Sequence, residues 1–157
     1  MSRPHRAGTP RRAVRLAVAA VLAIGYAVLV LVLTLRPGRT DPGVDDTLQV
    51  IAARLRDAGL AWADYAAVEW AANVVLFVPA GLLLALLLPG RARWWAVVLG
   101  TAASVAIETA QAVFLPGRVA SVADVAANTL GTTIGVAIAA FAVGLLARRR
   151  SALDPVG

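Results

Sequence analysis

The sequence contains no cysteine and a single histidine, and these two scarcities exclude several kinds of site. Without cysteine there is no disulfide framework, no zinc–thiolate centre and no thiol nucleophile. The histidine, His5, lies in an Arg-rich tail, so neither a Ser–His–Asp triad nor a histidine metal cluster is expected. We therefore expect no cofactor and no metal site.

Charged residues are also scarce, at 15% of the 157 residues, against about 25% in a typical globular chain. Hydrophobic residues make up 60%, above the roughly 45–50% of soluble domains. Lysine is absent, so that all 15 basic residues are arginines, and the nine acidic residues leave a net charge of +6. In so apolar a chain, this surplus indicates contact with anionic membrane lipids rather than with nucleic acid.

Four long apolar segments predict four transmembrane helices, over residues 16–35, 70–88, 94–115 and 125–147. The first segment carries no charge, and at about 1.5 Å per residue it can cross a hydrocarbon core of about 30 Å. A signal peptide is the alternative for this segment, but its apolar region would be shorter, about 7–15 residues. Pro-Gly pairs at 37–38, 89–90 and 116–117 follow the first three segments, where proline ends a helix. The predicted fold is all-α, a four-helix membrane bundle.

The placement of the arginines predicts that both termini are cytoplasmic. Most arginines lie in the tails 1–15 and 148–157 or in the short loop between the second and third segments, whereas the loop 36–69 holds most of the acidic residues. Short basic flanks stay on the cytoplasmic side of a membrane. We therefore expect a membrane domain over 16–147 between two basic cytoplasmic tails, in a multi-pass protein of the cell membrane.

The first outer loop contains a second kind of helix. Val44, Leu48, Ile51 and Leu55 recur at helical spacing with charged residues on the other faces, which predicts an amphipathic helix over 44–58. Two positions for this helix are equally favoured. It could lie on the outer membrane surface beside interfacial aromatic residues, or it could pack over the outer mouth of the bundle.

Polar side chains within the apolar segments mark a candidate site, because each is costly to bury in hydrocarbon without a partner. In the second, third and fourth segments, helical spacing places such residues and their neighbours on one face of each helix. The three faces are formed by Asn73, Phe77 and Gly81; by Thr101, Ser104, Glu108 and Gln111; and by Asp124, Asn128, Gly131 and Gly135. A short turn joins the third and fourth segments, so we expect their stripes to face each other. The strongest polar groups all fall in the outer half of the bundle.

Each of these residues has a structural reading beside a functional one. Pro79 could kink its helix, and Phe77, Gly81, Gly131 and Gly135 are typical of close helix packing. Gln111 and Asn128 could simply bond to neighbouring helices. A carboxylate as deep as Glu108 must be protonated, paired with a cation or in a wet cavity. Arg118 is its expected partner, and Asp124 competes for the same arginine. Asp124 could alternatively cap the N-terminus of its helix. The candidate ligand-binding residues are Asn73, Glu108, Gln111, Arg118, Asp124 and Asn128.

These residues resemble the VanZ-like family of integral membrane proteins. The matching pieces are Asn73-x-x-x-Phe77-x-Pro79-x-Gly81, then Glu108-x-x-Gln111, then Arg118-x-x-x-x-x-Asp124-x-x-x-Asn128-x-x-Gly131-x-x-x-Gly135. Together they extend over about residues 70–141, close to half of the chain. The family's namesake is linked to resistance to the glycopeptide teicoplanin, so the resemblance implies an envelope-facing role.

The leading hypothesis is a non-enzymatic envelope protein whose outward-facing polar pocket takes a lipid headgroup, a lipid-linked cell-wall precursor or a glycopeptide. A membrane-embedded enzyme is the first alternative, with Glu108 as the candidate acid or base. A small transporter is the second; it would need a homo-oligomer, for which Gly131 and Gly135 could supply the contact face.

Overall fold

The computed structural model describes residues 10–35, 42–115 and 120–153. These ranges contain no strand, as the all-α prediction requires. The elements, in chain order, are α1 (Pro10–Thr34), α2 (Pro42–Asp57), α3 (Tyr65–Leu87), the short 3₁₀ helix η1 (Gly90–Ala92), α4 (Trp95–Phe114) and α5 (Val122–Leu153).

Four of the helices are long and apolar enough to cross a membrane. The candidate spans are Ala13–Thr34, Tyr65–Leu87, Trp95–Phe114 and Val122–Arg149. They coincide, apart from their ends, with the four predicted segments, which are thereby confirmed. Large apolar side chains are exposed along them, among them Val21 and Phe141, which are 69% and 70% exposed. Such a surface is suited to hydrocarbon rather than to water.

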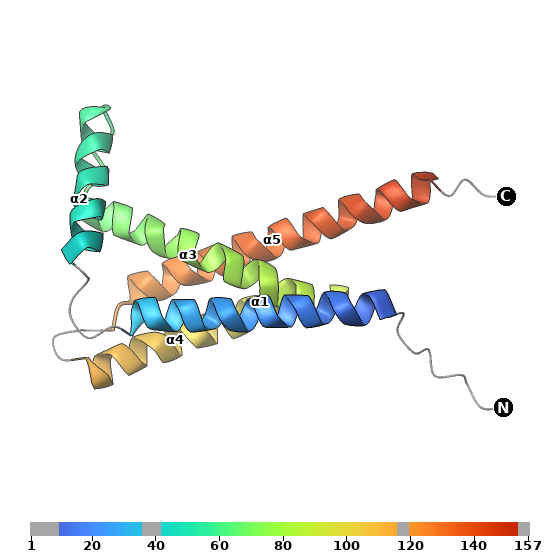
Figure 1. Cartoon of the computed structure of the whole chain (residues 1–157). Helices are drawn as coiled ribbons and strands as arrows, with labels where there is room; N and C mark the ends of the chain where they lie inside the picture. The colour runs from blue at the N-terminus through green and yellow to red at the C-terminus, as the bar shows by residue number, and fades with distance from the viewer. Residues whose placement is uncertain (1–9, 36–41, 116–119, 154–157) are drawn as a thin grey trace, which may run out of the picture.

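The closest helix contact in the structure joins α3 and α5, which cross near the middle of the bundle (Figure 1). A Cβ atom on Gly131 would overlap the carbonyl oxygen of Val74, and one on Gly135 would overlap that of Val78. Reciprocally, a Cβ on Gly81 would overlap the carbonyl oxygen of Thr132. Glycine is therefore required on both helices, because only the missing side chain lets the two backbones approach this closely.

Thr132 lies between three helices and is fully buried. Its backbone faces α3, while a Cβ on Gly100 of α4 would meet its side chain at 2.6 Å. The Thr132 hydroxyl donates to the carbonyl of Asn128 in the preceding turn, 2.8 Å away, so this buried polar group is satisfied within α5. The same face of α5 thus serves both neighbours.

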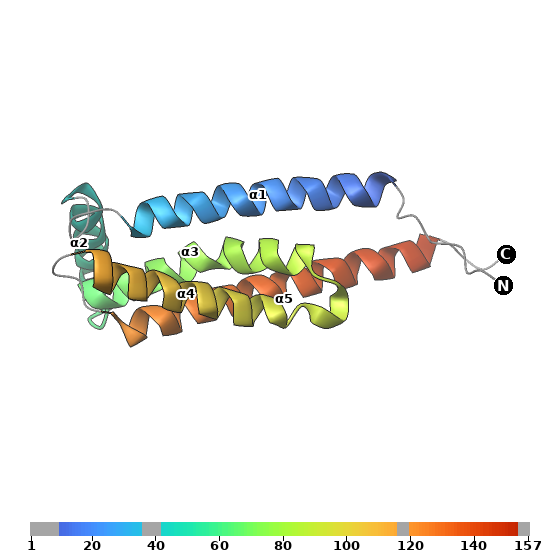
Figure 2. The same ribbon diagram turned by 90° about the horizontal axis from the view of Figure 1, so that it is seen from below.

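α1 lies along one side of the group formed by α3, α4 and α5 (Figure 2). Val30 packs with Phe77 and Ile107. The hydroxyl of Tyr26 donates to the carbonyl of Leu76, at 2.6 Å. This acceptor lies three residues before Pro79, where the helix is locally weakened because proline lacks the N–H group that would bind the carbonyl of Val75. These contacts of α1 therefore lie in its C-terminal half.

The start of α1, η1 and the end of α5 lie toward one end of the bundle, and α2 with the start of α5 lies at the other (Figure 1). This arrangement puts the outermost described residues of α1 and α5 at the same end. It is compatible with the expectation that both termini share one side of the membrane; which side they face remains a prediction.

α2 covers the range expected for the loop helix. It runs across the end of α3 and contacts it (Figure 1). Ala52 is buried, whereas Val50 and Ile51 are 57% and 41% exposed. The helix ends at Asp57. Gly59 follows with a φ of 95°, which suits glycine, and Gly59 N–H and Leu60 N–H donate to the carbonyl groups of Arg56 and Leu55. One face of α2 is therefore in contact with protein, and apolar residues on another remain available to a lipid surface.

The glycine contact predicts a clear difference between two alanine substitutions in α5. Gly131→Ala should lower the free energy of unfolding by about 1–3 kcal/mol, because the new methyl group forces α3 away. Gly144→Ala is the matched control, since nothing lies within 4 Å of its Cβ position; it should be neutral or stabilise by about 0.5–1 kcal/mol. Unfolding in detergent measures both, and equal effects would contradict the close contact.

Because the chain has no cysteine, introduced cysteines can report its orientation. We expect an impermeant maleimide to label Ala61→Cys in intact cells, and to label Gly90→Cys after permeabilisation alone. Both positions are exposed and lie in connections at opposite ends of α3. The reverse labelling pattern would contradict cytoplasmic termini.

Candidate functional site

A chain of hydrogen bonds joins α3, α4 and α5 at the end of the bundle that carries α2. The Asn73 side chain donates from Nδ2 to Oδ1 of Asp124, at 3.0 Å. The backbone N–H of Asp124 donates to Oγ of Ser121, at 3.1 Å, and the N–H of Ser121 donates to Oε2 of Glu108, at 2.8 Å. These four residues are called the polar cluster below. They bring together three of the predicted site residues.

Ser121, rather than Asp124, caps the N-terminus of α5. Its hydroxyl accepts from the N–H group three residues later, the bond typical of an N-cap serine. Asp124 lies in the first turn, where its negative charge is favoured by the helix dipole. With the capping task taken by Ser121, the Asp124 carboxylate is free to bind Asn73 across the helix interface.

Glu108 is 6% exposed. One of its oxygens accepts the Ser121 N–H group, so its carboxylate fixes the chain at the entrance to α5. The partner expected from the sequence, Arg118, lies outside the described residues. A cluster of Glu108, Arg118 and Asp124 therefore remains a prediction.

Gln111 and Asn128 bond to neighbouring helices. Gln111 donates from Nε2 to the carbonyl of Thr34, at 2.8 Å, and thereby satisfies a carbonyl at the free C-terminal end of α1. Asn128 donates from Nδ2 to Oγ of Ser104, at 2.9 Å. Among the described residues, Oδ1 of Asn128 is buried and has no hydrogen-bond partner. Ligand binding by these two side chains remains a prediction.

The polar and small stripes of the fourth segment face different neighbours. Towards α4 lie Asn128 and Thr129, which bond to Ser104 and to Thr101 respectively. Gly131 and Gly135 instead face α3. The expectation that this stripe would face the third segment is therefore correct for Asn128, whereas the Asp124 side chain and both glycines face α3. Since both glycines are buried within the chain, they do not provide the contact face between copies that a transporter would use.

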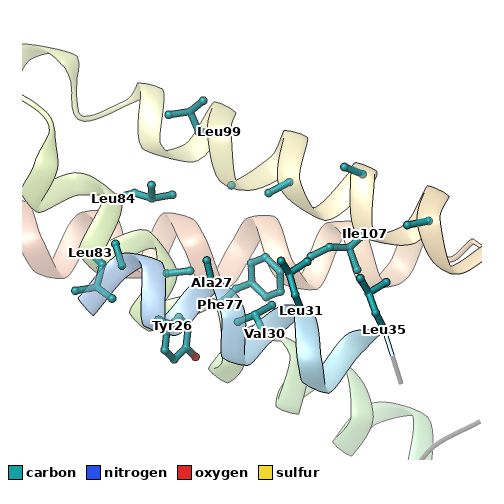
Figure 3. Close-up of a pocket in the computed structure, with 16 residues that line it drawn as sticks. Tyr26, Ala27, Val30, Leu31, Leu35, Phe77, Leu83, Leu84, Leu99 and Ile107 are labelled. Atoms are coloured by element: carbon teal, nitrogen blue, oxygen red, sulfur yellow. The ribbon is translucent and has the colours of Figure 1, made fainter. Parts of the chain in front are cut away.

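An apolar cavity of about 490 Å³ lies between α1, α3 and α4. Figure 3 shows Val30 and Leu31 of α1, Phe77 of α3 and Ile107 of α4 around it. Small residues at helical spacing form its α4 wall: Gly100, Ala103, Ala106 and Ala110. The sequence carries this stripe, but we did not predict a cavity from it, because spacing alone does not show whether a neighbour fills the space.

The cavity reaches the polar end of the bundle. Leu35 and Ala110 line it. Leu35 directly follows Thr34 in the chain and Ala110 directly precedes Gln111, and a hydrogen bond joins Thr34 and Gln111. Ile107 also lines it, and the next residue is Glu108 of the polar cluster. None of the four residues of the polar cluster lines the cavity, but the cavity extends to the level of the Gln111–Thr34 bond, at the same end of the bundle as the cluster.

Several residues that shape the site were not predicted. Thr132 and Gly100 fix the contact of α4 with α5, and Tyr26 and Thr34 attach α1. Thr132 follows Asn128 by four residues and so shares its face, which is a signal that could have found it. Within the described ranges, no group of three or more His, Cys, Asp or Glu residues could hold a metal ion.

A protein-family model described as VanZ/LLP1 matches residues 23–143. The match covers more than half of the chain. It includes the polar cluster, the second and third spans, and parts of the first and fourth spans. No curated protein and no solved structure matches the chain.

The Asn73–Asp124 bond predicts energetic coupling between α3 and α5. In a double-mutant cycle of Asn73→Ala and Asp124→Ala, we expect a coupling energy of about 0.6–1.7 kcal/mol in unfolding measured in detergent. Thr109→Val is the control partner for Asn73→Ala, because the Thr109 hydroxyl is exposed and bonds to its own helix. That pair should be additive; an additive result for Asn73 and Asp124 would contradict the bond.

Proposed function

The chain belongs to the VanZ/LLP1 family, and we propose that it is a multi-pass protein of the cell membrane that binds a lipid-linked molecule of the envelope without transforming it. Family membership and four apolar helices support the membrane assignment. The binding role rests on one observation, the apolar cavity that extends to the level of the Gln111–Thr34 hydrogen bond, at the end of the bundle that carries the polar cluster.

This arrangement matches the chemistry of an amphipathic ligand. An acyl or isoprenoid chain would occupy the cavity, where its burial contributes about 25 cal/mol for each Å² of apolar surface. The headgroup would then lie at the polar cluster, whose amide and carboxylate groups can exchange hydrogen bonds with sugar or phosphate groups. In this proposal Arg118, which precedes α5 in the sequence, contacts an anionic group of the ligand.

The polar cluster would face the envelope side. The predicted orientation places the arginine-rich tails in the cytoplasm, and the cluster lies at the opposite end of the bundle from the start of α1 (Figure 1). Lipid-linked cell-wall precursors and glycopeptides both meet the protein from that side. A teicoplanin-resistance-like role is the narrower form of this proposal.

Binding rather than catalysis is favoured by the bond that Glu108 makes. Its carboxylate accepts the Ser121 N–H group and so has a structural task in holding the turn. The enzymatic alternative requires the same carboxylate as acid or base. Glu108→Gln separates the two: an enzyme would lose turnover of a lipid-linked substrate, whereas a binding protein has no turnover to lose.

The binding proposal is tested by filling the cavity. We expect Ala103→Phe to reduce co-purified lipid-linked molecules about tenfold, which corresponds to about 1.4 kcal/mol, because the ring would occupy the chain site. The matched control is Ala102→Phe, on the same helix at an exposed position that does not line the cavity. Mass spectrometry of lipids extracted from equal amounts of folded protein measures both, and equal retention by the two variants would reject the cavity as the binding site.

The narrower resistance role has its own test. Cells making the wild-type protein should tolerate teicoplanin better than cells making equal amounts of Glu108→Gln or Asp124→Asn, because both changes alter the polar cluster. Growth across a teicoplanin dilution series measures this. Equal susceptibility of all strains and of cells without the protein would reject the resistance role while leaving the lipid-binding proposal to its own test.

A further inference from the structure

A second groove lies at the other end of α1, between α1 and the C-terminal part of α3. Its volume is about 700 Å³. Leucines make up much of its wall, among them Leu22 of α1 and Leu83 and Leu86 of α3. Two charged residues also line it, Arg15 of α1 and Arg93, which follows η1.

The two arginines have different surroundings. Arg15 is exposed, whereas Arg93 is half-buried. Among the described residues, Nε of Arg93 is buried and has no hydrogen-bond partner. A buried donor without an acceptor is unfavourable. Because Arg93 lines the groove, its guanidinium favours an occupant that can accept hydrogen bonds.

Among the described residues, the charges at this end of the bundle are of one sign. Arg91, Arg148 and Arg149 are exposed and lie toward the same end as Arg15 and Arg93. The described acidic residues belong to α2, to the segment that leads into α3, to the start of α3 and to the polar cluster, all toward the opposite end (Figure 1): Asp45, Asp46, Asp57, Asp64, Glu69, Glu108 and Asp124. The groove therefore favours an anionic occupant.

The dimensions of the groove indicate what kind of anion. Along α1 the lining runs from Val14 to Leu22, a rise of roughly 12 Å, which is close to half of a hydrocarbon core of about 30 Å. The arginines lie towards its end, beside Pro89 and Gly90 of the connection to α4. An apolar groove one leaflet deep with guanidinium groups at its mouth matches a phospholipid chain below a phosphate.

We infer that this groove is a binding site for one anionic phospholipid of the leaflet that surrounds the start of α1. The phosphate accepts hydrogen bonds from Arg15 and Arg93, and one acyl chain lies along Leu22 and Leu86. This site is separate from the polar cluster and does not depend on the function proposed above.

The test is a titration of delipidated, detergent-solubilised protein with phosphatidylglycerol or phosphatidylcholine, followed by native mass spectrometry. Wild-type protein should bind the first phosphatidylglycerol about tenfold more tightly than phosphatidylcholine, and Arg15→Gln/Arg93→Gln should abolish this preference. The matched control is Arg148→Gln/Arg149→Gln, which removes the same charge from exposed positions outside the groove; it should keep the preference.

Three results would overturn the inference. Equal binding of the two lipids by wild-type protein would mean that the groove selects no charge, and equal losses in the two double variants would mean that net charge alone attracts the lipid. Competition by millimolar inorganic phosphate as effective as that by the lipid would indicate a site for free phosphate. If Arg93→Gln impairs folding, Arg15→Gln alone, at an exposed position, should still weaken phosphatidylglycerol binding. Leu86→Trp should also weaken it, because the indole would occupy the place of the acyl chain of the lipid.

Discussion

The contact between the backbones of α3 and α5 is the constraint on which the rest of the structure depends. Within a membrane the lipid tails are as apolar as the helix surfaces, so helices associate through close packing and polar bonds rather than through the hydrophobic effect. Gly81, Gly131 and Gly135 provide that close packing. It sets the spacing at which Asn73 reaches Asp124, and it turns the remaining face of α5 towards α4.

The helices pack closely on the α5 side of this contact and leave spaces on the α1 side. On the α5 side, glycine and threonine leave no room between helices, and buried Ser104 and Asn128 are bonded to each other. On the α1 side, Tyr26 and Gln111 attach the helix at two points, and spaces remain between and beyond them. In the proposed function, the spaces beside α1 are where a chain-like molecule from the bilayer would enter.

The sequence was sufficient for the spans and for the faces of the helices, but not for the partners of those faces. Long, mostly apolar runs predicted the four spans, because length and hydropathy are local properties. The spacing of Asn128 and Gly131 placed them on one side of their helix, yet one bonds to α4 and the other meets α3. The contacts that Thr132 makes with two helices and the cavity arise from how neighbouring helices fit, which periodicity does not report. The Ser121 cap is a local bond, and a serine just before a helix is a signal that could have found it.

The proposal that the cavity beside the polar cluster holds the chain of a lipid-linked ligand is tested most directly by photolabelling. A polyprenyl phosphate with a diazirine at its apolar end, added below one equivalent to the detergent-solubilised protein, would be irradiated and its adducts mapped by mass spectrometry. We predict that adducts concentrate on cavity-lining residues such as Leu31 and Ile107. Adducts spread equally over Val113 and Phe141, which are exposed and do not line the cavity, would contradict the proposal.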